Sequence, residues 1–142
     1  MPEFTAGRIR KPHPYAWVWE PLEGEPTFAL RAMFGAQAAY LDDKICLCFM
    51  AKDEPWRGVL VCTHREQHAA LQAEFSALMP HVVLHKWLYL PESAEDFESV
   101  ATQLVRLVQQ RDARIGVLPA VKKRKRQGLL VNRPVFRGGR LV

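Results

Sequence analysis

The feature that most constrains the fold is a series of short apolar runs, separated by turn residues, between Thr27 and Thr63. The runs are TFALRAMF, AQAAYL, ICLCFMA and GVLVCT, and the separators are Gly35, Asp42-Asp43-Lys44 and KDEPWR. Runs of this length bounded by Gly, Asp and Pro predict four β-strands in an antiparallel meander. The Asp-Asp-Lys link is short enough for a tight hairpin, because Asp tolerates the turn conformations that such a hairpin needs.

Two helical patterns and one further strand follow. Thr63-His64-Arg65-Glu66 has the form of a capping box and predicts a helix from about residue 64 to 79. Residues 81–91, HVVLHKWLYLP, predict a fifth strand, and Ser93 predicts the cap of a second helix. The apolar stripes of the two helices are Leu71, Phe75, Leu78 and Met79, and then Phe97, Val100, Ala101, Leu104, Val105 and Val108.

The element order β-β-β-β-α-β-α predicts an α+β fold. We expect a two-layer sandwich in which two helices lie on one face of an antiparallel sheet of about five strands. Composition divides the chain into a Pro-rich aromatic N-terminal arm (1–26), this α+β domain (27–116) and a basic C-terminal tail (117–142). Because five prolines in the arm rule out a long regular helix, we expect an irregular or single-strand segment that packs its aromatic residues on the domain.

Charge is distributed unevenly along the chain. The net charge is +5, but all fifteen acidic residues precede Val117 and eight of the twenty Lys and Arg residues follow it. The tail therefore carries +8, whereas the preceding residues have twelve basic against fifteen acidic side chains, a net charge of −3. Such a tail predicts sequence-independent, salt-dependent binding to DNA or RNA, and the solvated tail without a ligand is the alternative. The candidate nucleic-acid-binding residues are Lys122, Lys123, Arg124, Lys125, Arg126, Arg133, Arg137 and Arg140.

Both faces of the predicted strands are apolar. Both faces of residues 81–91 are substantially apolar: one carries Val82, Leu84, Lys86, Leu88 and Leu90, and the other carries His81, Val83, His85, Trp87 and Tyr89. Helices cover only one face, and a large apolar patch is rarely left in water. The arm, a second copy of the chain or residues 129–136, LLVNRPVF, could cover the other face, and we favour the arm together with a homodimer or another protein partner. The candidate interface residues are Trp17, Trp19, Val83, His85, Trp87 and Tyr89.

The sequence resembles one protein family. Arg31-Ala32-Met33-Phe34-Gly35, followed by Tyr40-Leu41-Asp42-Asp43-Lys44 and an apolar strand, is similar to the N-terminal domain of TfoX/Sxy-type proteins. The similarity covers Thr27 to about Val108. It implies a small α+β fold, shared more loosely with YjbR-like domains, and a role linked in some relatives to competence regulation, without catalytic residues. The Pro-rich arm stands here in place of the family's leading helix.

Three cysteines and several histidines have spacings that can bind metal. Cys46-x-Cys48 and Cys62-x-His64 lie on strands that we expect to be adjacent, and this spacing points the two residues of each pair to one face. Three thiols and one imidazole would suit a tetrahedral zinc ion. We favour the alternative that the cysteines are free thiols packed as small hydrophobes, and we assign no metal ligand. His64 and His68 share one helix face that could hold a metal, and capping the edge of the buried stripe is the alternative that we favour. His81 and His85 share the second sheet face with Trp87 and could form a polar pocket, and an interface or surface position is the alternative that we favour.

Catalytic motifs are absent from the sequence. It contains no Gly-rich phosphate loop, nucleophile elbow or His-Glu-x-x-His motif, so we assign no catalytic or cofactor-binding residue. No run approaches the roughly 18 apolar residues of a membrane span, and we expect a cytoplasmic protein without a membrane partner. The expected function is a non-enzymatic interaction or regulatory module that self-associates through its apolar sheet face. A nucleic-acid-associated protein that uses its basic tail is the alternative.

Overall fold

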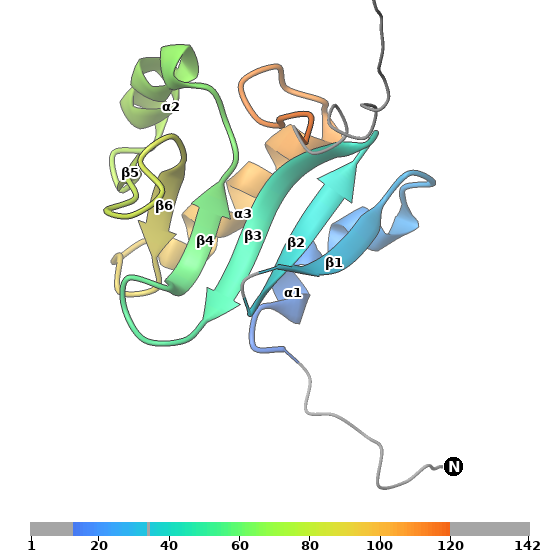
Figure 1. Cartoon of the computed structure of the whole chain (residues 1–142), viewed down its shortest axis with the longest axis horizontal. Helices are drawn as coiled ribbons and strands as arrows, with labels where there is room; N and C mark the ends of the chain where they lie inside the picture. The colour runs from blue at the N-terminus through green and yellow to red at the C-terminus, as the bar shows by residue number, and fades with distance from the viewer. Residues whose placement is uncertain (1–12, 34, 120–142) are drawn as a thin grey trace, which may run out of the picture.

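The computed structural model describes residues 13–33 and 35–119, whose strands form one six-stranded antiparallel sheet (Figure 1). The strand order is β1-β2-β3-β4-β6-β5, so the first four strands form the predicted meander. Asp42 and Asp43 both have positive φ, 56° and 67°, as the two central residues of a type I′ hairpin turn require. The strands are β1 (Ala29–Met33), β2 (Ala36–Leu41), β3 (Lys44–Ala51), β4 (Arg57–Val61), β5 (Met79–Pro80) and β6 (Leu88–Pro91).

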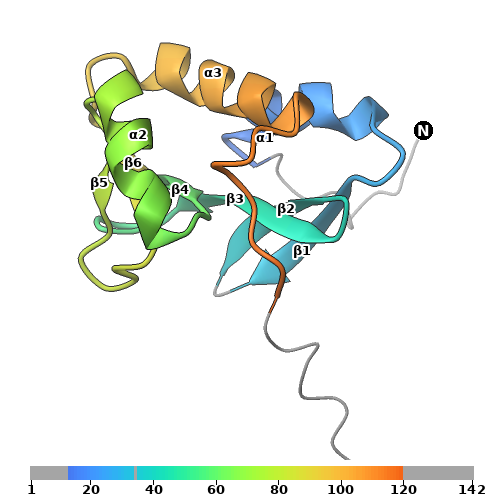
Figure 2. The same ribbon diagram turned by 90° about the horizontal axis from the view of Figure 1, so that it is seen from above.

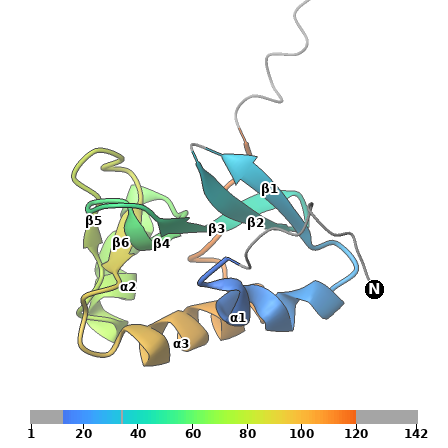
Figure 3. The same ribbon diagram turned by 90° about the horizontal axis from the view of Figure 1, so that it is seen from below.

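The helices of the described residues lie on one face of this sheet, which we call the helix face. Figures 2 and 3 show α3 and α1 on the same side of the strands, with α2 next to β5 and β6. The arrangement confirms the expected α+β fold with an antiparallel sheet. The helices are α1 (Ala16–Trp19), α2 (His68–Glu74) and α3 (Phe97–Gln109), and the 3₁₀ helices are η3 (Glu20–Gly24) and η4 (Arg65–Gln67).

The core of the helix face is formed largely by α3 and the central strands. The predicted stripe of α3 is confirmed, because all six of its residues are buried. They pack in one cluster with strand residues that include Leu47, Phe49, Val59 and Leu90. Burial of each large apolar side chain contributes roughly 1.5–3 kcal/mol, so this cluster supplies much of the stability.

The N-terminal arm is part of this core, which corrects two expectations. Its residues from Ala16 to Gly24 are helical, as α1 and η3, so the prediction of an irregular or single-strand segment is wrong. Tyr15, Val18, Trp19 and Leu22 are buried against the helix face, and the Trp19 ring lies 5.0 Å from that of Phe49. The arm therefore does not cover the opposite face of the sheet. The 3₁₀ helix η3 tolerates Pro21 because this residue falls in its first turn, where its missing N–H needs no partner within the helix.

Both predicted helix starts are also corrected. The Thr63 hydroxyl donates to the Arg114 carbonyl at 2.6 Å instead of capping a helix, and α2 is shorter than expected because Phe75 is already extended. Helix α3 begins at Phe97, with Asp96 and not Ser93 at the N-cap and no side-chain capping bond. At the first helix the Thr63 hydroxyl is taken up by a distant carbonyl. At the second, residues 91–97 form turns that delay the start of the helix beyond Ser93.

The strand predicted over residues 81–91 is confirmed only in its second half. Strand β6 begins at Leu88, and residues 81–87 form a loop that is closed by the His81 N–H donating to the Trp87 carbonyl at 3.0 Å. This loop turns onto the face of the sheet opposite the helices, which we call the second face. The apolar character of residues 82–84 therefore belongs to a loop that covers a sheet and not to a strand.

A β-bulge in β3 changes which face the cysteines occupy. Ala39 pairs with Leu47, but Tyr40 pairs with Ile45, so Cys46 is an extra residue in β3. As a result Cys46 packs on the helix face, whereas Cys48 and Cys62 pack on the second face. The expectation that Cys46 and Cys48 point to one face is wrong. Within the ranges that the structure describes, no helix has the length and apolar character needed to cross a membrane.

Candidate binding site on the second face

The second face of the sheet carries its own apolar cluster, covered mainly by loops. Trp56, from the loop between β3 and β4, and Leu84, from the 81–87 loop, pack on it, as does Val117, which forms an isolated bridge with Ile45. The cluster consists of Ala36, Ala38, Ile45, Cys48, Met50, Leu60, Cys62, Trp87 and Tyr89. The chain itself therefore covers much of the face that the sequence left open.

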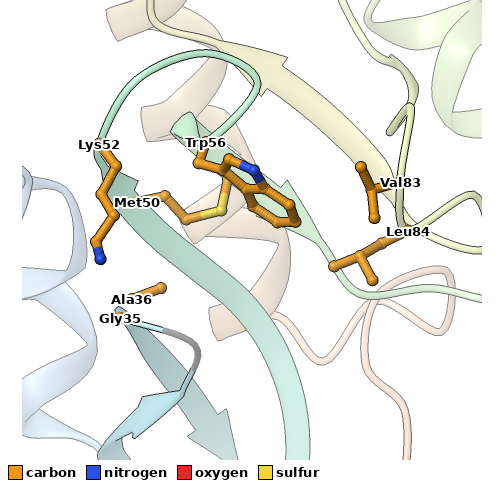
Figure 4. A pocket seen from close by; sticks show the side chains of 7 residues that line it. All are labelled: Gly35, Ala36, Met50, Lys52, Trp56, Val83 and Leu84. Carbon is orange, nitrogen blue, oxygen red and sulfur yellow. The ribbon is translucent and has the colours of Figure 1, made fainter.

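The loops leave one apolar hollow on this face, with a volume of about 400 Å³ (Figure 4). Ala36 of β2 and Met50 of β3 come from the sheet, while Val83 and Leu84 form the wall on the opposite side. The Trp56 ring stands between these two sides. The lining residues are Gly35, Ala36, Met50, Lys52, Trp56, Val83 and Leu84. A concave, mostly apolar site of this size lies within the range of small-molecule sites.

His81 ties the two loop walls together. Its ring is fully buried, and its Nδ1 accepts hydrogen bonds from the backbone N–H groups of Val83 and Leu84, both at 3.0 Å. Because Nδ1 accepts, the ring proton lies on Nε2, which donates to the Pro55 carbonyl at 2.7 Å. The ring also contacts Trp56, with centroids 4.5 Å apart. One neutral imidazole therefore positions residues on both sides of the hollow.

The hollow has a single charged side chain, Lys52. Figure 4 shows this side chain extending toward Gly35 and Ala36. A Cβ atom on Gly35 would lie 2.6 Å from the lysine Nζ, and Gly35 has a φ of +76°, so glycine both forms the turn and leaves space for the ammonium group. No carboxylate of the described residues lies within ion-pair distance of Nζ, and the nearby Glu54 carboxylate accepts a hydrogen bond from the Tyr89 hydroxyl.

Polar groups beside the hollow form a closed network. The Tyr89 hydroxyl contacts Glu54 Oε1 and the Arg57 carbonyl, both at 2.7 Å, and accepts from the Arg57 N–H at 3.0 Å. Glu92 accepts from the Tyr15 hydroxyl at 2.8 Å and from Arg57 Nε at 2.6 Å. These two donors hold the pKa of Glu92 below its ordinary value, whereas burial and the neighbouring carboxylates raise the pKa of both tyrosines. The network fixes the ends of β4 and β6.

The candidate interface residues are separated by the structure. Val83 is 55% exposed and lines the hollow, and His85 is exposed in the same loop. Trp87 and Tyr89 are buried in the second-face cluster, each with 8% exposure, and Trp19 is buried on the helix face. Trp17 is 44% exposed and belongs to α1, also on the side of the helices. Val83 is thus the member of this group that the structure places at the hollow.

The structure does not bring the proposed zinc ligands together. The Sγ atoms of Cys48 and Cys62 lie 3.9 Å apart in the buried cluster, but Cys46 is on the opposite face and His64 is exposed. Burial raises the pKa of Cys46 to about 11 and that of Cys62 well above its ordinary value, so both thiols hold their protons at neutral pH. No group of three or more His, Cys, Asp or Glu in the described ranges could hold a metal.

The remaining histidines and Arg31 make local contacts. The His68 Nε2 lies 3.0 Å from the Lys86 carbonyl, and the His85 Nε2 lies 2.8 Å from the Val82 carbonyl. Arg31 is on the edge strand β1, where its guanidinium lies over the Tyr40 ring at 5.1 Å. The eight candidate nucleic-acid-binding residues, Lys122 to Arg140, and the apolar segment 129–136 lie outside the described residues.

Sequence reasoning missed Lys52, Trp56 and Gly35 as neighbours in one site. The segment KDEPWR predicts a turn by its composition, but it also contains a tryptophan. Aromatic side chains rarely lack a packing partner. That signal could have identified Trp56. The proximity of Lys52 to Gly35 could not have been predicted, since it depends on how two separate turns meet across β2 and β3.

Comparison of the chain with protein-family models, curated proteins and solved structures found no match. The similarity of residues 27–108 to TfoX/Sxy-type proteins therefore stays a prediction, and the function has to be inferred from the site itself.

Proposed function

We propose that this chain is a non-enzymatic interaction module that self-associates through its second sheet face. The observation that carries the proposal is the apolar hollow together with its exposed wall. Val82 and Val83 are 68% and 55% exposed, and they adjoin a concave surface made by Met50, Trp56 and Leu84. Apolar surface of this kind, gathered around a hollow, is typical of protein interaction sites.

The size of a stable interface indicates which residues take part. A standard interface buries roughly 800 Å² on each partner, which is more than a hollow of this size offers. The contact therefore extends onto Val82, Val83 and His85, so that the 81–87 loop is the centre of the interface. In a symmetric dimer this loop of each copy packs against the hollow of the other.

A non-catalytic role is supported by the bonds of the polar groups around the hollow. His81 and Tyr89, which lie next to Trp56 on this face, each use their polar atoms in bonds that hold the backbone or a neighbouring side chain in place. Catalytic groups need a proton or lone pair directed at a substrate. A regulatory role like that of TfoX/Sxy-type proteins is part of this proposal, because Gly35 and Asp42-Asp43 form the two turns that carry the resemblance.

Light scattering or sedimentation at micromolar protein concentration tests the self-association. The full chain should have the mass of a dimer, and Val83→Asp should have that of a monomer, because it places a charge in the apolar contact. Trp17→Asp is the matched control, since it alters an exposed aromatic residue on the side of the helices and should leave the dimer intact. A monomeric full chain, or a Val83→Asp variant that stays dimeric, would overturn the proposal.

The second candidate function is binding to DNA or RNA through residues 122–140, which the charge distribution favours. The described residues carry nine basic and fourteen acidic side chains, a net charge of −5. Arg57, Arg111 and Arg114 among them pair with carboxylates, so the described part supports no polyanion surface. Titration of duplex DNA at two salt concentrations should therefore give affinity and a salt slope that are lost when residues 120–142 are removed. Equal slopes with and without these residues would exclude this candidate.

A further inference from the structure

We propose that the hollow on the second face is a binding site for a small amphipathic carboxylate, whose apolar or aromatic body lies in the hollow and whose carboxylate pairs with Lys52. The proposal goes beyond self-association and does not require it, because the ligand binds to the hollow of one copy of the chain, which the partner's loop would occupy in the dimer.

The walls of the hollow determine the body of the ligand. Met50, Trp56 and Leu84 present a thioether, an indole and a branched aliphatic group, which favour an aromatic ring or a branched hydrocarbon. The volume of about 400 Å³ suits a compact molecule. Strongly polar ligands are disfavoured because, apart from Lys52, the lining side chains offer only the indole N–H of Trp56 as a hydrogen-bonding group.

The charge at the hollow determines the head group. Among the described residues that line the hollow Lys52 alone is charged, and its Nζ lies on the Gly35 side, across the hollow from Val83 and Leu84. A ligand whose body rests on Trp56 can thus place a carboxylate beside Nζ at the opening. Lys52 is exposed, so this pairing adds selectivity for an anion more than it adds affinity.

The hollow is held in shape before a ligand arrives. His81 fixes the backbone of Val83 and Leu84 on one side and of Pro55, next to Trp56, on the other. The imidazole ring itself is fully buried, so both of its nitrogens bond to these loops and not to water. A site with fixed walls binds its ligand with a smaller loss of conformational entropy than a site that must form on binding.

The test compares three probes that share one body: 4-phenylbutyrate, 4-phenylbutanol and 4-phenylbutylamine. Each is titrated into the full chain at neutral pH, and binding is followed by the NMR signal of the Trp56 indole N–H. All contacts of the body are the same, so the butyrate should bind about two- to fivefold more tightly than the alcohol, as expected for one exposed ion pair. The amine should bind most weakly.

Two variants and one control make the test specific. Lys52→Gln should remove the preference for the butyrate while leaving the affinity for the alcohol unchanged. Ala36→Leu should weaken all three probes, because it fills the hollow. Lys44→Gln, which removes an exposed lysine that does not line the hollow, should match the wild type. The same spectra report whether each variant is folded.

Several results would overturn the ligand proposal. These are the absence of any shift of the Trp56 signal, equal affinity of the wild type for the butyrate and the alcohol, or a butyrate preference that persists in Lys52→Gln. Light scattering on the same samples reports self-association separately. Because the partner's loop and the ligand would compete for the hollow, saturating butyrate should shift a dimer toward the monomer. A monomer that binds the butyrate would refute only the dimer, and a dimer that neither binds a probe nor dissociates at saturating probe would refute only this site.

Discussion

At the scale of single residues, His81 does the most to organise the second face. Its two ring nitrogens bond to three backbone groups from two loops, and its ring lies between Trp56 and Tyr89. The neighbouring His85 has the same chemistry but is exposed and lies near one carbonyl of its own loop. Two identical side chains four residues apart thus differ because only one is surrounded by buried backbone donors and acceptors.

Replacing His81 by alanine should therefore strongly destabilise the protein. The substitution removes the partner of three partly buried backbone groups and the ring that packs against Trp56 and Tyr89. Each polar group left without a partner in a buried place costs roughly 1–3 kcal/mol, so we expect a loss of about 3 kcal/mol for the three together. Urea denaturation followed by circular dichroism measures the free energy of unfolding. His85→Ala is the control and should differ little from the wild type. Similar stability for the two variants would show that the His81 bonds do not hold the loops.

The Glu92 carboxylate should make stability depend on pH in acid. Its pKa in the folded protein is lowered by the Tyr15 hydroxyl and by Arg57, so the folded state favours the charged form. This stabilisation is fully present above the ordinary pKa of a glutamate, 4.5, and is lost as the pH falls through the lower, folded value.

Thermal melts between about pH 6 and pH 3 measure this contribution. The wild type should lose stability as the pH falls, and Glu92→Gln should show a shallower loss because it has no carboxylate to protonate. Tyr15→Phe should also flatten the curve, since it removes the first of the two donors. A Glu92→Gln variant with the same pH dependence as the wild type would assign the acid sensitivity to other carboxylates.

At the scale of elements, the N-terminal arm belongs to the core. Elements α1 and η3, with Tyr15 just before them, bury four side chains against α3 and the sheet, and the Gln109 side chain at the end of α3 donates to the Pro21 carbonyl at 3.1 Å. The boundary expected at residue 26 therefore marks a change in amino-acid composition, but the segments before and after it share one core. The segment closes the end of the helix face near β1 and β2 (Figure 3).

Trp19→Ala should accordingly destabilise the protein far more than Trp17→Ala. Trp19 is 4% exposed and packs on Phe49, so its removal leaves a cavity, which typically costs about 3–5 kcal/mol for a tryptophan. Trp17 is only two residues away and mostly exposed, which makes it a matched control. The two variants can be compared by thermal unfolding. Equal melting temperatures would contradict the packing of the arm in the core.

Elements with a strong local pattern were predictable from the sequence, whereas those set by distant contacts were not. The α3 stripe and the Asp42-Asp43 hairpin follow from periodicity and turn chemistry within a few residues. The loop at residues 81–87 has the composition of a strand, but the bonds of His81 turn it across the second face. The bulge at Cys46 was likewise invisible, because an extra residue in an apolar run leaves its composition unchanged.

The candidate site was predictable only in its apolar character. The expectation of a second apolar face and the choice of Val83 came from the strand pattern. Trp56 and Lys52 lie in the turn between β3 and β4, and no sequence pattern predicts what this turn contacts. The hollow forms where the turn meets the 81–87 loop. Such meeting points depend on sheet order, which places β4 between β3 and β6.

At the scale of the whole molecule, Arg111 connects three distant parts of the chain. It follows α3, and its guanidinium pairs with Asp42 of the β2–β3 hairpin and with Glu25 of the arm, at 2.9 Å and 3.0 Å. These pairs raise the pKa of Arg111 and lower that of Asp42. All three side chains are partly exposed, so the expected contribution to stability is small and sensitive to salt.

Arg111→Gln should lower the melting temperature slightly at low salt and not at all in about 1 M NaCl, where the screening length is roughly 3 Å. Thermal melts of both proteins in the two buffers measure the difference. Arg111 also has a positive φ of 56°, but glutamine has the same backbone preference, so the comparison isolates the charge. A difference that persists at high salt would indicate packing by the arginine stem instead.

The bridge between Val117 and Ile45 fixes the place from which the basic tail starts. Two backbone hydrogen bonds, at 2.9 Å and 3.0 Å, attach residue 117 to β3, and its side chain packs on the second-face cluster. The bridge lies at the start of β3, whereas the hollow takes Met50 from the other end of the same strand, so Val117 and the hollow share one face but not one end of the sheet. If the residues that follow Val117 bind a polyanion and the second face binds a partner, both ligands are linked through this one fixed point of the chain, so even weak affinities at the two places would reinforce each other.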